Sequence, residues 1–195
     1  MRPALWHASG ATGVICLVLF SLVAILGILV NQQGRLPGLP RFAVTGLHRH
    51  LSLLMIVFLG VHIVTALAAR HAKIPWPSAV VPFISGYQRF WVGLGAVALD
   101  LLAAVLITSL LRDRLTPFVW RGVHLMAYAA YPVAVGHTYG SHPDVQSGWL
   151  FALVLTTALA VVTAVGYRVS RRLRTVSRPH RVPNELARAA RSAGV

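Results

Sequence analysis

The sequence predicts an all-α integral membrane protein, a bundle of five transmembrane helices. The 195-residue chain is 56% hydrophobic and only 11% charged. Its apolar runs approach the roughly 20 residues that a helix needs to cross a bilayer. Its basic residues gather in the connections between these runs. The net charge of +14 therefore points to a lipid bilayer as partner and not to nucleic acid.

The apolar runs place the five spans in order along the chain. They are expected near residues 11–30, 47–69, 90–111, 123–139 and 149–167. The first apolar run follows a basic residue, Arg2, as the apolar part of a signal peptide does. However, the run is too long for a signal peptide and no small-x-small cleavage site follows it, so we expect a retained helix. Because Cys16 is the single cysteine, an intrachain disulfide and a cysteine-rich metal site are excluded.

Arginine and lysine set the predicted orientation. The connections before the second span, between the third and fourth, and after the fifth hold fourteen of the eighteen basic residues. The positive-inside rule places these connections in the cytoplasm, so the N-terminus lies outside and the C-terminus inside. We expect residues 1–170 to form the membrane domain. Residues 171–195 are predicted to form a basic cytoplasmic tail, poorly ordered and attracted to anionic lipid.

Four histidines occupy matched depths on two spans that run in the same direction. His48 and His62 are fourteen residues apart, which places them about 21 Å apart and within roughly 40° of one helix face. His124 and His137 are thirteen residues apart, about 20 Å along the axis, with an angular mismatch of roughly 140° on a straight helix. Pro132 lies between them, and a proline kink is one way to bring both rings to a common face.

Two such pairs are the arrangement that two haems stacked across a membrane require. Each iron would take one neutral imidazole from each helix, which fills both axial positions and favours electron transfer over oxygen binding. The inner haem is assigned to His48 and His124, and the outer haem to His62 and His137. His50 is the alternative to His48, although it points about 120° away from His62. Small residues beside the ligands would let a porphyrin approach the helices: Gly46, Gly60, Gly122 and Gly136.

Three further polar residues bear on such a site. Arg49 and Arg121 lie beside the inner ligands and are candidates for bidentate pairing with haem propionates, although the positive-inside rule already explains them. Asp100 falls near the middle of the third span, where a carboxylate is costly. It could accept the second ring N–H of a ligand histidine or form a structural hydrogen bond to a neighbouring span, and the sequence leaves both open.

The segments HRHLSLLMIVFLGVH and WRGVHLMAYAAYPVAVGH resemble the ferric reductase-like transmembrane domain. This family includes ferric reductases, the membrane part of NADPH oxidases and the haem subunit of the periplasmic methionine sulfoxide reductase system. The resemblance covers roughly residues 10–167. It implies a bundle in a bacterial cytoplasmic membrane that holds two b-type haems and carries electrons outward. Carried over by position, the family's ligands match His48, His62, His124 and His137.

The sequence also departs from the full reductases of this kind, which append a cytoplasmic flavin and NADPH domain. A short basic tail stands here instead. We therefore expect electrons from a separate flavoprotein or from a quinol, and the outer acceptor is not identified.

Two other functions are compatible with intramembrane histidines. One is a metal-ion carrier that uses them transiently, which predicts a colourless protein whose metal binding is lost with any one histidine. The other is a haem-free membrane scaffold with hydrogen-bonding histidines, which predicts that the protein still folds when any of the four histidines is replaced.

Overall fold

The computed structural model describes residues 2–31, 40–69 and 73–176, and within these ranges it is helical and contains no strand. The longer helices are α1 (Arg2–Asn31), α2 (Arg41–Ala68), α3 (Arg89–Leu110), α4 (Pro117–Leu125), α5 (Ala127–Ser141) and α6 (Gly148–Val176). Three short 3₁₀ helices join them: η1 (Trp76–Ala79), η2 (Arg112–Arg114) and η3 (Pro143–Gln146). The predicted all-α class is confirmed for the described residues.

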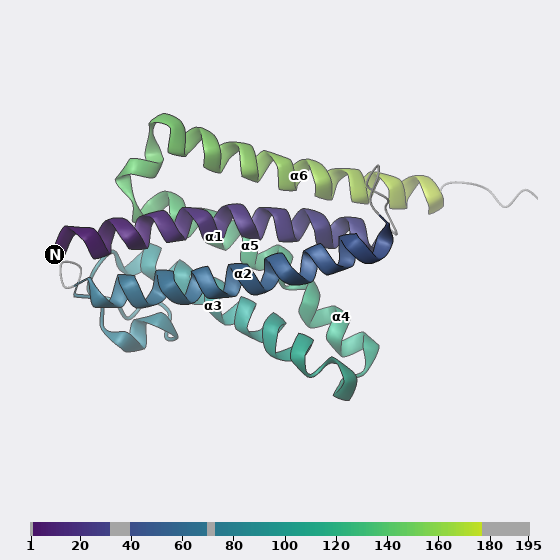
Figure 1. The fold of residues 1–195 in the computed structure, drawn as a ribbon, viewed down its shortest axis with the longest axis horizontal. Helices are drawn as coiled ribbons and strands as arrows, with labels where there is room; N and C mark the ends of the chain where they lie inside the picture. Colours follow the sequence, from purple (N-terminus) through teal and green to yellow (C-terminus); the bar gives the residue numbers. More distant parts are fainter. Residues whose placement is uncertain (1, 32–39, 70–72, 177–195) are drawn as a thin grey trace, which may run out of the picture.

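Successive long helices run in alternating directions, with α4 and α5 together forming one passage (Figure 1). One end of the bundle therefore holds the N-terminus, η1 and η3. The other end, which we call the arginine-rich end, holds the start of α2, the η2–α4 turn and the end of α6. It carries Arg49, Arg112, Arg114, Arg121 and Arg168.

Within the described residues, four helices are long and apolar enough to cross a membrane. They cover Ala4–Val30, Phe42–Ala68, Arg89–Leu110 and Gly148–Arg171. The chain is thus a multi-pass integral membrane protein. The fourth predicted span, at 123–139, corresponds to α4 and α5, which are separated at Met126. Neither reaches the length of a single spanning helix, so the count of five spans stays a prediction, as does the orientation.

Two element boundaries differ from the expected ones. The first helix begins at Arg2, well before the predicted residue 11, because the polar residues near its start are compatible with a helix although they end the apolar run. The last helix continues to Val176, past the predicted domain boundary at residue 170. Its final turns carry the first arginines of the predicted tail. The rest of that tail, 177–195, lies outside the described residues.

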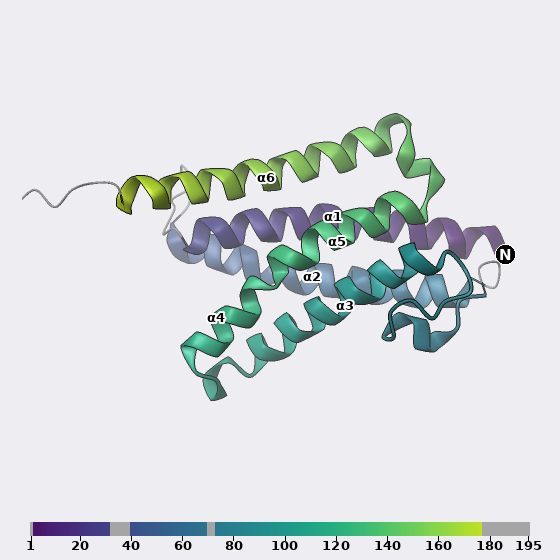
Figure 2. The ribbon, with the colours of Figure 1, turned by 180° about the vertical axis from the view of Figure 1, so that it is seen from behind.

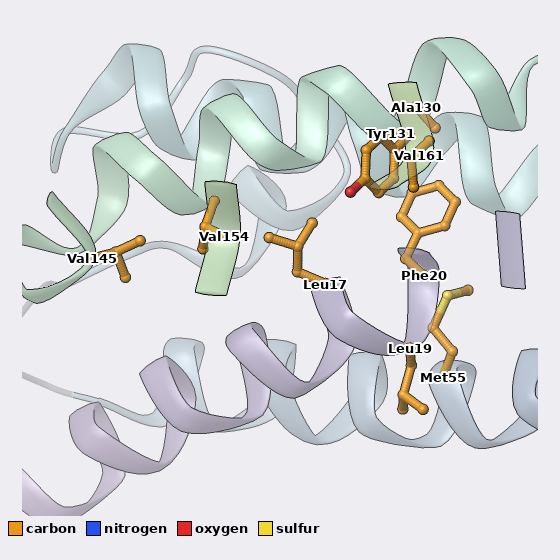
Figure 3. Packing of buried hydrophobic residues seen from close by; sticks show 9 residues of the cluster. All are labelled: Leu17, Leu19, Phe20, Met55, Ala130, Tyr131, Val145, Val154 and Val161. Atoms are coloured by element: carbon orange, nitrogen blue, oxygen red, sulfur yellow. The ribbon is translucent and has the colours of Figure 1, made fainter. Parts of the chain in front are cut away.

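Helix α1 lies at the centre of the bundle and packs against α2, α5 and α6 (Figures 1 and 2). Its residues Leu17 and Phe20 belong to a buried apolar cluster that also includes Tyr131 of α5 and Val161 of α6 (Figure 3). The Phe20 and Tyr131 rings meet edge to face at 5.2 Å. The Tyr131 hydroxyl is within hydrogen-bonding distance of Ser21 Oγ, at 2.8 Å. This contact ties α5 to α1 where the side chains are buried.

Two pairs of helices share the most extensive packing, α2 on α1 and α3 on α5. No extensive packing joins α2 to α3 or to α5 among the described helices. The space between the pairs is where the histidine side chains of α2, α4 and α5 meet.

The passage formed by α4 and α5 is irregular at Met126. The Met126 N–H donates to the carbonyl of Val123 at 2.9 Å, a tighter 3₁₀-type bond than the α-helical pattern. Pro132 lies inside α5, after this break. A proline cannot donate the helical hydrogen bond of its position and tends to bend the helix before it. The interruption changes the relative direction of side chains on α4 and α5.

Candidate functional site

The first histidine pair lies toward the end that holds the N-terminus. His62 of α2 and His137 of α5 face each other with ring centroids 6.1 Å apart and ring planes at 84°. Both line a cavity whose unfilled space is about 1220 Å³, including the part open to the outside. Its walls are mostly apolar and come from α1, α2, α3 and α5, including Leu17, Phe20 and Met55.

The second pair lies toward the arginine-rich end. His48 of α2 and His124 of α4 face each other with ring centroids 6.5 Å apart and ring planes at 62°. His50 is exposed, and its Nδ1 bonds to the carbonyl of Gly46 on its own helix at 2.8 Å. Of the two candidates on α2, His48 is therefore the one whose ring meets His124.

Three of the four facing imidazoles bond to a backbone carbonyl of a neighbouring helix. His62 Nδ1 lies 2.8 Å from the oxygen of Ser9, and His48 Nδ1 lies 3.1 Å from that of Val23. His137 Nδ1 lies 2.8 Å from the oxygen of Trp91. A carbonyl can only accept, so each Nδ1 carries the proton and donates it. This leaves the Nε2 lone pair of each ring available to a metal ion.

His124 is supported differently. Its Nδ1 is buried and has no hydrogen-bond partner in the described structure. Its ring stacks on Trp120, with centroids 5.1 Å apart and planes at 27°. The Arg112 guanidinium also lies over the Trp120 ring, 4.6 Å from its centroid. The Trp120 ring thus contacts both a guanidinium and an imidazole at the arginine-rich end.

The separation of the facing rings fits one metal ion between them. Imidazole nitrogen binds first-row metals at about 2.0–2.1 Å, so two rings on opposite sides of an ion have centroids about 6 Å apart once the ring radius is added. Groups of three or more His, Cys, Asp or Glu that could hold a metal are not found in the described part of the chain. Structural zinc sites need four protein ligands, whereas a haem iron needs only one or two axial ligands. The residues present therefore fit a haem with two histidine ligands.

Arg49 and Arg121 are both exposed and lie beside the second pair in sequence, one on α2 and the other on α4. Their pairing with haem propionates stays a prediction. Asp100 is exposed on α3. Of the two roles that the sequence left open for it, acceptance of a histidine ring N–H is not the arrangement in the described structure, because backbone carbonyls accept three of these protons and His124 Nδ1 has no partner.

The glycines beside the histidines are not those in contact with the rings. A Cβ added at Gly46, Gly60 or Gly122 would meet nothing within 4 Å. The imidazoles instead contact glycines on other helices, Gly13, Gly27 and Gly95, which are distant from the histidines in the sequence. The sequence holds a signal that could have found two of these glycines. Fourteen residues separate Gly13 from Gly27, as fourteen separate His48 from His62.

His142 is a further histidine that lines this cavity. It follows the end of α5, and its ring lies 5.0 Å from that of Trp6. Burial lowers the pKa of His142, the neighbouring ionisable ring of His62 lowers it further, and the carboxylate of Asp144 opposes these effects. The imidazole is thus favoured in its neutral form at this end of the cavity.

Comparison with known families identifies the chain. The family described as "Ferric reductase like transmembrane component" matches residues 12–135, which is more than half of the 195 residues. The chain belongs to this family. The ferric reductase-like match includes His48, His62 and His124 and ends just before His137. Domains of this family generally bind haem, and membership makes the protein a membrane redox component. Comparison with curated proteins and with solved structures gives no match.

Proposed function

We propose that this chain is a dihaem b-type cytochrome that carries electrons across the membrane as one component of a reductase. The observation that carries the proposal is the presence of two pairs of facing imidazoles, at 6.5 and 6.1 Å, toward opposite ends of the bundle. His48 and His124 would hold the inner haem, and His62 and His137 the outer haem. Each haem supplies a one-electron couple between ferric and ferrous iron.

The chain's own residues would do three things for these groups. Each pair of imidazoles would supply two ligands to one haem, and a haem held by two histidines is suited to electron transfer rather than to oxygen binding. The hydrogen bonds to backbone carbonyls fix the tautomer and direction of His48, His62 and His137. The mostly apolar walls of the cavity would lower the local dielectric around a bound haem and so help to set its potential.

The arginine-rich end is proposed to face the cytoplasm, as the positive-inside rule requires. Electrons would enter there from a separate flavoprotein or reach the chain from a quinol. They would leave toward an acceptor at the outer side. Arg49 and Arg121 would then lie at the inner headgroup level, where a guanidinium can pair with a propionate.

The first test is a spectrum of the full chain. The protein is purified in mild detergent from haem-replete cells, and visible spectra are recorded before and after addition of dithionite, with haem counted per polypeptide. We expect two b-type haems. His50→Ala is the matched control for His48→Ala, and only the second should lose the inner haem. A colourless, well-folded protein would overturn the proposal in favour of a scaffold or a metal-ion carrier.

Transfer across the membrane needs its own measurement. Vesicles that contain the protein are loaded with ferricyanide, and dithionite is added outside. Reduction of the enclosed ferricyanide should be faster than in protein-free vesicles, and His62→Ala should abolish this difference. A dihaem protein that gives no acceleration would contradict transmembrane transfer while leaving haem binding intact.

A further inference from the structure

Three of the facing imidazoles share one local arrangement, which we call a carbonyl cradle. Each cradle consists of a helix carbonyl, a glycine four residues later on the same helix, and the imidazole of another helix. The imidazole Nδ1 donates to the carbonyl, and its ring contacts the glycine. The cradles are Ser9–Gly13–His62, Val23–Gly27–His48 and Trp91–Gly95–His137.

The glycine is what gives the ring access to the carbonyl. In an α-helix the carbonyl of one residue already accepts the N–H of the residue four positions later, and its second lone pair remains free. The imidazoles approach over residue 13, 27 or 95. An added Cβ would lie 2.7 Å from His137 Nδ1 at Gly95, 3.0 Å from His62 Nδ1 at Gly13 and 3.3 Å from His48 Cε1 at Gly27. At Gly95 the His137 ring would have to leave its position. At Gly13 and Gly27 the ring would have to shift by a few tenths of an ångström.

Two cradles repeat along one pair of antiparallel helices. Fourteen residues separate Gly13 from Gly27 on α1, and fourteen separate His48 from His62 on α2. The helices run in opposite directions and rise equally per residue, so the glycine and histidine positions coincide twice. Two coincidences at the same spacing indicate that the glycines belong to the histidine sites and are not incidental small residues of a helix contact.

The fourth imidazole has no cradle, and α3 indicates why. Thirteen residues separate Gly95 from Thr108, as thirteen separate His124 from His137 on the facing passage. The position level with His124 is thus close to Thr108, which has a side chain. Its hydroxyl donates to the carbonyl of Ala104 at 2.7 Å, the oxygen that a cradle at this position would use. His124 stacks on Trp120 instead.

We infer that Gly13, Gly27 and Gly95 are positioning residues that hold three of the four haem-ligand imidazoles as Nδ1–H donors, and that Trp120 replaces a cradle for His124. The inference rests on the proposed haem function. It makes the two haem sites unequal, because the outer haem has two ligands bonded to carbonyls and the inner haem has one. A hydrogen bond from Nδ1 makes an imidazole a stronger donor to the metal, which favours ferric iron and lowers the potential.

The test is a redox titration of each haem in glycine variants, combined with haem content and the low-spin ferric EPR signal. Gly95→Ala and Gly13→Ala should move the outer-haem potential to more positive values or release that haem, with the larger effect for Gly95→Ala. Gly27→Ala should act more weakly and on the inner haem alone. Each variant should alter the EPR signal of its own haem, because the ring orientation changes.

Two control variants separate positioning from general packing. A Cβ at Gly93 would lie 2.2 Å from Phe83, and its three nearest atoms all belong to that ring, so Gly93→Ala crowds α3 more severely than Gly95→Ala. It should lower the melting temperature without moving either potential. Gly166→Ala meets nothing within 4 Å and should change nothing. At the inner site Trp120→Phe should retain the inner-haem EPR signal, and Trp120→Leu should change it.

The outcomes distinguish the inference from the proposed function. If the wild-type protein contains no haem, both the proposed function and the inference are overturned. A wild-type protein with two haems whose potentials and EPR signals are unchanged in Gly95→Ala and Gly13→Ala overturns the inference alone. An equal shift of both haems in Gly93→Ala and Gly95→Ala would also overturn it, because crowding of α3 would then be sufficient.

Discussion

The two passages that carry the histidines are built differently. Helix α2 runs without interruption from Arg41 to Ala68 and presents His48 and His62 to the same partner side. The opposite passage is divided at Met126 into α4, with His124, and α5, with His137. A spacing of fourteen returns nearly to the same face of a straight helix, whereas a spacing of thirteen does not. Two imidazoles can thus face a common partner side from a regular helix or from a broken one, and their spacing in the sequence decides which is needed.

The largest expected effect comes from removing one ligand of one pair. His62→Ala and His137→Ala should each reduce haem content from two per chain to one, with the inner-haem absorbance retained, because the pairs share no ligand. Haem analysis and reduced-minus-oxidised spectra measure this result. Loss of both haems in a protein that remains folded would mean that the two passages do not provide independent sites.

A change in the broken passage should have a partial effect. Pro132→Ala restores a backbone N–H inside α5 and favours a straight helix, in which His124 and His137 no longer point the same way. We expect reduced occupancy of one haem and an unchanged signal from the other. Pro117→Ala is the matched control, because Pro117 stands in the first turn of α4, where no helical donor is required. Full occupancy of both haems in Pro132→Ala would show that the break at Met126 does not depend on this proline.

A smaller effect is expected where α5 is tied to α1. Tyr131→Phe removes the hydroxyl that lies 2.8 Å from Ser21 Oγ but keeps the ring against Phe20. A buried hydrogen bond contributes about 1 kcal/mol, so the melting temperature in detergent should fall by a few degrees. Haem content should stay at two. A loss of haem would show that this contact positions His137 as well as stabilising the bundle.

The smallest expected effect concerns the start of α4. The Thr116 hydroxyl accepts the N–H of Val119 at 3.4 Å, a long N-cap hydrogen bond. Thr116→Ala should destabilise α4 by about 0.5 kcal/mol, the low end of such caps. The inner haem should dissociate slightly faster in a transfer assay, and the outer haem at the wild-type rate. Equal acceleration for both haems would indicate that α4 and α5 respond as one helix.

Much of the site was accessible from sequence because the depth of a residue in a transmembrane helix follows from its position in the chain. The four histidines and their assignment to two pairs required only the count of residues along the apolar runs, and the pairing stays a prediction until haem is measured. The support of the rings was not accessible. Asp100 was a reasonable acceptor by residue type, yet the acceptors are backbone carbonyls, which every residue carries and no sequence pattern marks.

Long apolar runs were sufficient to predict a helical membrane protein, because in a bilayer such runs can satisfy their backbone hydrogen bonds only as helices. The sequence by itself also determined the family, through segments whose histidine spacing the fold preserves. Tertiary structure decided which side of each helix meets which neighbour. The break at Met126, the facing of His48 rather than His50 toward His124, and the approach of three rings to glycines all depend on contacts between helices. Such contacts join residues distant in the chain, and their geometry is set by the packing of the whole bundle.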